Sequence, residues 1–91
     1  MVPAHTAQFI LAECRLAGTS GRFIFGSHAL ERMEKRNATR GDVRSALTSA
    51  ILATFQPDNG RWKIAGGKDR SGDALDMAVV FENGLVVITV F

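Results

Sequence analysis

The spacing of apolar residues changes once along this chain, near Ile51, from the period of a helix to the period of a strand. Between Val43 and Ile51 they recur at positions i, i+3, i+4, i+7 and i+8, which is typical of an amphipathic helix. Thr39 and Asp42, just before this run, have the spacing of a capping box. From Ile51 onward, apolar and polar residues alternate. The sequence therefore predicts an α+β fold, with helices mainly in the first half and strands in the second.

Turn signals divide the second half into four predicted strands, over residues 51–56, 61–68, 74–82 and 85–91. Asn59-Gly60 and Asn83-Gly84 are dipeptides that favour tight antiparallel hairpins. The last of these strands is apolar on both faces, which is typical of a central strand. A further short strand is expected at residues 22–25.

Two more helices are expected in the first half. One is predicted over about Pro3–Ala17, followed by a turn at residues 18–21. Its core-facing positions are Ala7, Ile10, Leu11 and Cys14. The other is capped by Ser27 and ends near Asn37, a residue that suits the left-handed conformation of a helix C-terminus.

These elements predict a single domain over residues 1–91, in which residues 1–20 form an extra N-terminal helix and turn before a core at 21–91. We expect the helices to pack on one face of a mostly antiparallel sheet of four to five strands. Phe9 and Leu16 fall on the outer side of the first helix. They predict either a partner-binding or oligomer-forming surface or a helix wedged between elements of its own domain.

Composition excludes several classes of protein. Cys14 is the only cysteine, so an internal disulfide cannot form, and the two histidines, His5 and His28, are too far apart in sequence to make a typical zinc motif. We therefore expect no metal site and no cofactor. No apolar run is long enough to cross a membrane, and no signal peptide is apparent, so a cytoplasmic protein without a membrane partner is expected.

The stretch SHALERMEKR contains the most suggestive polar pattern. His28, Arg32 and Arg36 are spaced four residues apart and fall on the border between the buried and solvated sides of the predicted helix. Histidine exchanges protons near neutral pH, and arginines bind phosphate oxygens bidentately. The stripe predicts either a site for a phosphate-rich partner or a structural arrangement in which the arginines pair with nearby carboxylates.

Three segments in order, HALERMEKRNATRGDVRSAL, GRWKIAGGKDRSGDALDMAVVF and LVVITVF, resemble a bacterial family known as domain of unknown function 4258, which is related to RelE/BrnT-like toxins of toxin–antitoxin modules. The resemblance covers about Phe23 to Phe91. The family pattern corresponds here to His28, Glu31, Arg32, Arg36, Lys63 and Thr89. The chain departs from it in its extra N-terminal helix and in Asn37-Ala38, where a glycine and an aliphatic residue are usual.

The resemblance implies a RelE-like fold and the toxin of a type II module, a metal-independent endoribonuclease that cleaves mRNA, on or off the ribosome, and is silenced by a cognate antitoxin. The hypothesis assigns catalysis to His28, Arg32, Arg36 and Lys63. It assigns further RNA contacts to Arg22, Lys35, Arg61 and Lys68. The alternative is a non-catalytic module that binds RNA, the ribosome or a protein through the same basic surface, because the chain has no tyrosine to act as a second proton donor.

Overall fold

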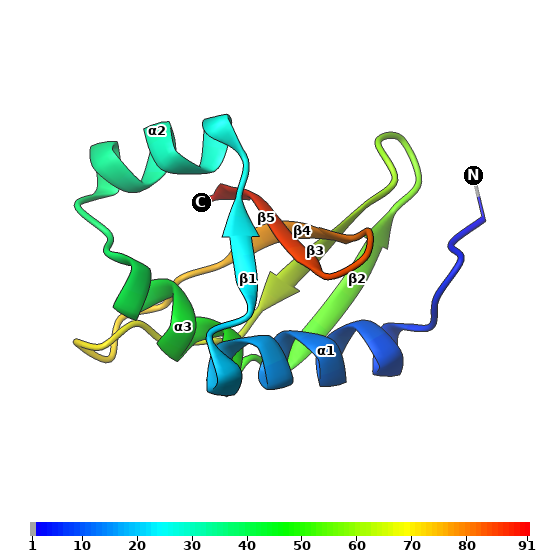
Figure 1. The fold of residues 1–91 in the computed structure, drawn as a ribbon, viewed down its shortest axis with the longest axis horizontal. Helices are drawn as coiled ribbons and strands as arrows, with labels where there is room; N and C mark the ends of the chain where they lie inside the picture. The colour runs from blue at the N-terminus through cyan, green and yellow to red at the C-terminus, as the bar shows by residue number, and fades with distance from the viewer. Residues whose placement is uncertain (1) are drawn as a thin grey trace.

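Residues 2–91 are described by the computed structural model, which contains three helices and one five-stranded sheet (Figure 1). In chain order the elements are α1 (Ala7–Ser20), β1 (Phe23–Phe25), α2 (Ser27–Arg36), α3 (Arg40–Ser49), β2 (Leu52–Gln56), β3 (Arg61–Ala65), β4 (Met77–Phe81) and β5 (Leu85–Val90). The α+β class is therefore confirmed. None of the helices within residues 2–91 is long and apolar enough to span a bilayer.

The sheet has the order β1-β5-β4-β3-β2 and is mixed. Strands β2 to β5 form an antiparallel meander, whereas β1 pairs with β5 in parallel, with Phe23 opposite Leu85. Gly60, Asn83 and Gly84 have positive φ values of 71°, 55° and 129°, which allow the two tight turns of the meander. The predicted hairpins are thus confirmed, and β5 lies between two strands as its apolar character predicts.

One face of the sheet is buried and the other is largely open. The buried face contributes to the core the residues Ala53, Trp62, Ile64, Met77, Val79, Leu85 and Val87. Helix α1 lies on this side, with α3 packed beside it (Figure 1), and they add Ile10, Cys14, Val43 and Leu47 to the same core. On the opposite face, Ile24 is 64% exposed and Lys63 is also exposed. The open face is therefore accessible to other molecules.

Helices α1 and α3 cross at a glycine. A Cβ atom on Gly18 would lie 2.5 Å from Thr48 Oγ1 and 2.8 Å from the Arg44 carbonyl oxygen, closer than real atoms approach. Each helix also sends an arginine to the end of the other. Arg15 donates to the Ala50 carbonyl at 2.9 and 3.1 Å, and Arg44 donates to the carbonyls of Gly18 and Thr19 at 3.0 Å. These bonds satisfy carbonyls that the helix ends leave without partners.

The predicted capping box of α3 is present and also fixes a loop. Asp42 accepts hydrogen bonds from the Thr39 and Arg70 backbone N–H groups at 2.9 and 3.1 Å. These backbone bonds lower the pKa of the Asp42 carboxyl. At the other end of α3, Ser49 Oγ accepts from the Lys68 N–H at 2.9 Å. Both ends of α3 are thereby tied to the connection between β3 and β4.

Three predicted helix boundaries were wrong: both ends of α1 and the start of α2. Helix α1 begins at Ala7, after Thr6 caps it through the Phe9 N–H, and runs through the expected turn to Ser20 because Gly21 adopts the left-handed conformation instead. Consequently Ala7 is exposed rather than in the core. Helix α2 is preceded by Gly26, so Ser27 is its first helical residue and not its cap. Its end at Asn37, with φ of 57°, is as predicted.

Other departures lie around the sheet. Ile51, expected in the core, is 67% exposed, because α3 stops at Ser49 and the Ile51 N–H bonds to the Ala65 carbonyl beside β3. Leu75 is buried as expected but precedes β4. The expectation that the helices share one face is also corrected, since α2 lies across the end of β1 and β5, away from α1 and α3 (Figure 1).

We expect Gly18→Ala to lower the free energy of unfolding by about 1–3 kcal/mol, because the new methyl group overpacks the crossing of α1 and α3. Gly41→Ala is the matched control, since Gly41 also lies in a helix but its Cβ would meet mainly the flexible Arg70 side chain. Helix propensity alone predicts stabilisation for both. Urea unfolding of both variants checks this, and a stabilised Gly18→Ala would contradict the packing.

We expect Asp42→Asn to destabilise the fold at neutral pH and to lose this effect in acid. Because the folded-state pKa of Asp42 is lowered, its contribution is present above the ordinary carboxyl pKa of about 3.9 and disappears as the pH falls through the folded-state value. The measurement is the wild-type minus variant unfolding free energy between about pH 6 and about pH 2.5. Asp58→Asn, in the exposed hairpin turn, is the control, and a pH-independent difference for Asp42→Asn would refute the linkage.

Candidate phosphate-binding pocket

Helix α2 is held at the end of the sheet with one side in the core. Ala29 and Met33 are buried, and the Gly26 N–H donates to the Val87 carbonyl at 2.9 Å just before the helix begins. His28 directly precedes Ala29, and Arg32 directly precedes Met33. Arg32 is half-buried, as the predicted border position requires, whereas His28 is exposed.

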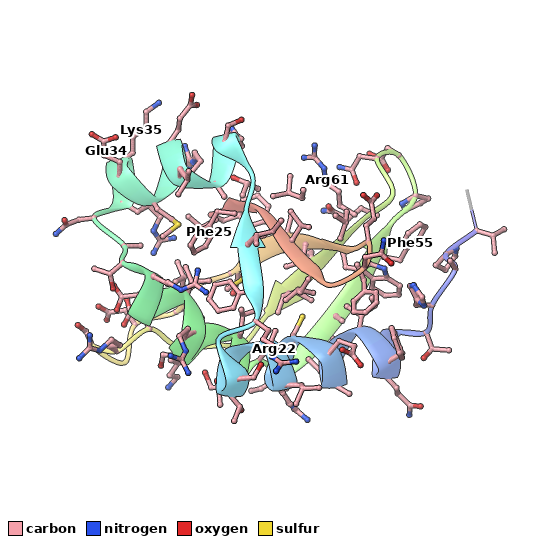
Figure 2. All side chains as sticks on the ribbon, in the orientation of Figure 1. Arg22, Phe25, Glu34, Lys35, Phe55 and Arg61 are labelled. Atoms are coloured by element: carbon pink, nitrogen blue, oxygen red, sulfur yellow. The ribbon has the colours of Figure 1, made fainter. Side chains whose placement is uncertain are left out.

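A pocket of about 430 Å³ opens between α2 and the hairpin that joins β2 to β3. Its lining consists of His28, Arg32, Gln56, Asn59, Arg61, Ala78, Thr89 and Phe91. In Figure 2, Arg61 projects from the start of β3 on the side of the sheet where α2 lies. We call this cavity the α2–hairpin pocket. It joins residues from α2, the hairpin and both central antiparallel strands.

The cations of the α2–hairpin pocket are not neutralised within the described chain. Arg32 is half-buried, and its Nε donates to the Val90 carbonyl at 3.4 Å. Within residues 2–91, neither Arg32 nor Arg61 forms an ion pair with a carboxylate. No aspartate or glutamate lines the pocket. The expected alternative, in which arginines of the stripe pair with carboxylates, is therefore not what the structure contains.

His28 is accessible at the mouth of the pocket. Its Nδ1 lies 3.9 Å from Glu31 Oε2, one turn along α2, and the two side chains are 60% and 72% exposed. This is the one ion pair found among residues 2–91. A long, exposed contact of this kind contributes little to stability. It leaves the imidazole free to approach a bound molecule.

Sequence reasoning did not select five residues of the pocket, of which Ala78 is a small apolar residue of β4. Gln56 and Asn59 present side-chain amides from the hairpin, and Phe91 contributes an aromatic ring. Thr89 matched the family pattern but was assigned neither to catalysis nor to RNA binding; its hydroxyl donates to the Val90 carbonyl at 3.3 Å. The Asn59-Gly60 dipeptide predicted the hairpin, but it could not predict that the tip of this hairpin faces α2.

Two residues assigned to catalysis lie outside the pocket lining. Arg36 points elsewhere, and its Nη2 donates to the Ala74 carbonyl at 3.4 Å. Lys63 is exposed on the open face opposite Ala78, with its Nζ 5.7 Å from the centre of the Phe91 ring. Lys63 is thus beside the pocket, whereas Arg36 is on a different side of α2.

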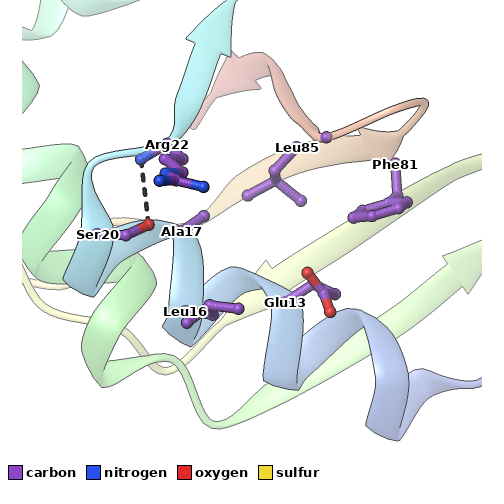
Figure 3. Close-up of a pocket in the computed structure, with 8 residues that line it drawn as sticks. Glu13, Leu16, Ala17, Ser20, Arg22, Phe81 and Leu85 are labelled. Atoms are coloured by element: carbon purple, nitrogen blue, oxygen red, sulfur yellow. Dashed lines mark hydrogen bonds between the residues drawn. The ribbon is translucent and has the colours of Figure 1, made fainter.

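Three of the residues assigned to RNA binding are dispersed. Lys35 lies on the solvated side of α2, as Figure 2 shows, and Lys68 lies in the connection after β3. Arg22 lines a second, more apolar cavity of about 480 Å³ between α1 and the β4–β5 hairpin (Figure 3). Of this set, only Arg61 joins His28 and Arg32 in the α2–hairpin pocket.

The outer residues of α1 have different surroundings. Phe9 packs within its own domain, stacked on His5 at 4.6 Å and edge-on to Phe81 at 5.3 Å between ring centroids. Leu16 is 59% exposed and borders the cavity of Figure 3. Cys14 is buried in the core, and burial together with the charge of Glu13 raises the pKa of its thiol to about 12. Within residues 2–91, no three His, Cys, Asp or Glu side chains are grouped to hold a metal ion.

Comparison with known families decides the classification. The model of the family described as Domain of unknown function (DUF4258) matches residues 25–91, from the end of β1 to the last residue. The chain belongs to this family. The matched region of the DUF4258 domain contains the entire α2–hairpin pocket, whereas α1 precedes it. No curated protein and no solved structure matches the chain.

Proposed function

We propose that this DUF4258 domain is the toxin of a bacterial type II toxin–antitoxin module and acts as a metal-independent endoribonuclease on mRNA. The observation that carries the proposal is the α2–hairpin pocket, which His28 and Arg32 of α2 line together with Arg61 of β3, and whose lining contains no carboxylate. Such a lining suits a phosphodiester, because phosphate oxygens accept hydrogen bonds from guanidinium groups in bidentate geometry. The predicted RelE-like fold and the antitoxin partner belong to the same proposal.

The reaction is an intramolecular transesterification. The 2′-oxygen of a nucleotide forms a bond to the adjacent phosphorus, and the bond from phosphorus to the 5′-oxygen of the next nucleotide breaks. The products are a 2′,3′-cyclic phosphate and a free 5′-hydroxyl. His28 accepts the 2′-hydroxyl proton, and solvent water returns a proton to the leaving 5′-oxygen.

Arg32 and Arg61 stabilise the charge that develops on the phosphoryl oxygens. They face the pocket from α2 and from β3. Positive groups fixed before the reaction need no reorganisation when the transition state forms. Lys63, beside Phe91, adds positive charge along the path of the RNA backbone, while Arg36 has no direct part because its guanidinium lies outside the pocket lining.

A non-catalytic RNA- or protein-binding module is the second candidate. It is favoured by the presence of a single histidine in the pocket lining, since a second acid–base group is usual in efficient general acid–base catalysis. Both functions use the same basic surface, but only the first depends on a 2′-hydroxyl and on the imidazole of His28.

The test is cleavage of a labelled RNA oligonucleotide, with and without ribosomes, in the presence of EDTA. We expect cleavage by the wild type, a loss of roughly 100-fold or more for His28→Ala, and a similar loss for Arg32→Ala. Arg36→Ala and Arg70→Ala remove the same charge outside the pocket and are expected to retain activity. Circular dichroism of each variant establishes that it is folded.

The outcomes separate the two candidates. Cleavage that persists in EDTA, stops with a 2′-deoxy substrate and depends on His28 supports the nuclease. Salt-sensitive RNA binding by fluorescence anisotropy, without cleavage and unchanged in His28→Ala, identifies a binding module instead. Absence of both cleavage and binding in folded protein would refute an RNA-directed function.

A further inference from the structure

We propose that the hairpin side of the α2–hairpin pocket is a nucleobase subsite that prefers guanine over adenine, with Asn59 as its specificity-determining residue. This inference rests on the proposed function, because it assigns the base of a nucleotide whose phosphate lies against His28 and Arg32. The residues that carry it are Asn59 and Gln56, with the Arg61 backbone N–H, which donates to Asn59; the Arg61 guanidinium stays assigned to the phosphate.

The pocket is large enough for more than a phosphate group. Its volume of about 430 Å³ falls within the range of sites that hold whole small molecules. The lining is also divided by chemistry. His28 and Arg32 lie on α2, whereas the two amides lie on the hairpin, and the Phe91 ring and Ala78 give apolar surface beside them. This division fits a nucleotide, which is charged at one end and flat, polar-edged at the other.

The side chain of Asn59 is held in one orientation. Its Oδ1 accepts a hydrogen bond from the Arg61 backbone N–H at 3.0 Å. The hairpin around it is closed by the Gly60 N–H, which donates to the Gln56 carbonyl at 2.8 Å. Because its oxygen is engaged in this way, Asn59 presents chiefly its Nδ2 donors to the pocket.

Donors outnumber acceptors on this side of the pocket. Asn59 presents its Nδ2 donors, and Gln56 offers the two donors of Nε2 together with Oε1, the principal side-chain acceptor of the hairpin. Guanine offers the acceptors O6 and N7 on one edge, whereas adenine has its N6 amino group, a donor, in place of O6. A donor facing a donor leaves both groups without partners, so the Asn59 Nδ2 donors favour guanine, whereas Gln56, which has both donors and an acceptor, accommodates either base.

Titrations followed by ¹H–¹⁵N NMR test the inference, using guanosine 3′-monophosphate, adenosine 3′-monophosphate and inorganic phosphate. We expect the guanosine nucleotide to bind the wild type about threefold to tenfold more tightly than the adenosine nucleotide, which is the effect of one hydrogen bond. Shifts are expected at the amides of His28, Asn59 and Arg61.

Asn59→Asp is the decisive variant, because it preserves the acceptor for the Arg61 N–H while replacing the Nδ2 donors with an oxygen. The ratio of the two nucleotide affinities should fall to one or reverse. Asn83→Asp is the matched control, since it introduces the same charge at the other hairpin turn, outside the pocket, and the ratio should be unchanged. The ratio is the informative quantity because the added negative charge weakens both nucleotides alike.

Each result has a definite meaning. A guanine preference that Asn59→Asp removes and Asn83→Asp retains supports the subsite. Equal affinities for both nucleotides in the wild type, with phosphate still bound at His28 and Arg32, overturn the subsite and leave the proposed function standing. If neither phosphate nor either nucleotide shifts the pocket residues, both the subsite and the proposed phosphate chemistry are refuted.

Discussion

The position of α3 is the constraint on which the rest of the structure depends. On one side its backbone touches α1 at Gly18, and on the other a Cβ on Gly67 would collide with the Ala46 carbonyl. Both approaches are possible only without a side chain. The hydrogen bonds of Asp42 and Ser49 to the β3–β4 connection then attach the helical layer, α1 and α3, to the sheet. The connection that leads from β3 to β4 is thereby held against both ends of α3.

The hydrogen-bond partners of the arginines explain why the chain contains a cationic pocket although its net charge is only +2. Three arginines donate to main-chain carbonyls: Arg15 and Arg44 at helix ends, and Arg40 beside β1. These carbonyls receive no hydrogen bond from a side chain of their own element, so the arginines take the place of a cap. Arg32 also donates to a main-chain carbonyl, that of Val90 at the end of β5, through Nε alone. Because these bonds involve carbonyls rather than carboxylates, the positive charge of each arginine is not compensated.

The candidate site was only partly predictable. Helical spacing selected His28 and Arg32, which both line the pocket, because neighbouring positions on one helix can be derived from sequence; of the two, Arg32 is the half-buried border residue and His28 is exposed. It also selected Arg36, but after two steps of four residues Arg36 is rotated about the helix axis by nearly a quarter turn relative to His28. Arg36 therefore reaches the Ala74 carbonyl instead of the pocket. No local sequence pattern indicated that Gln56, Asn59 or Phe91 belongs to the site, because these residues reach α2 from segments that are far from it in the chain.

The sequence by itself determined what depends on neighbouring residues: the capping box of α3, the Asn-Gly turns, the end of α2 at Asn37, the alternation of the strands and the membership of a family. These follow from local backbone energetics and from the period of the apolar residues. Only the tertiary structure decided that α1 continues through Gly18, that β1 joins β5 in parallel, and that α2 lies across the end of the sheet. Those features depend on close approaches between distant segments, which apolar periodicity does not encode.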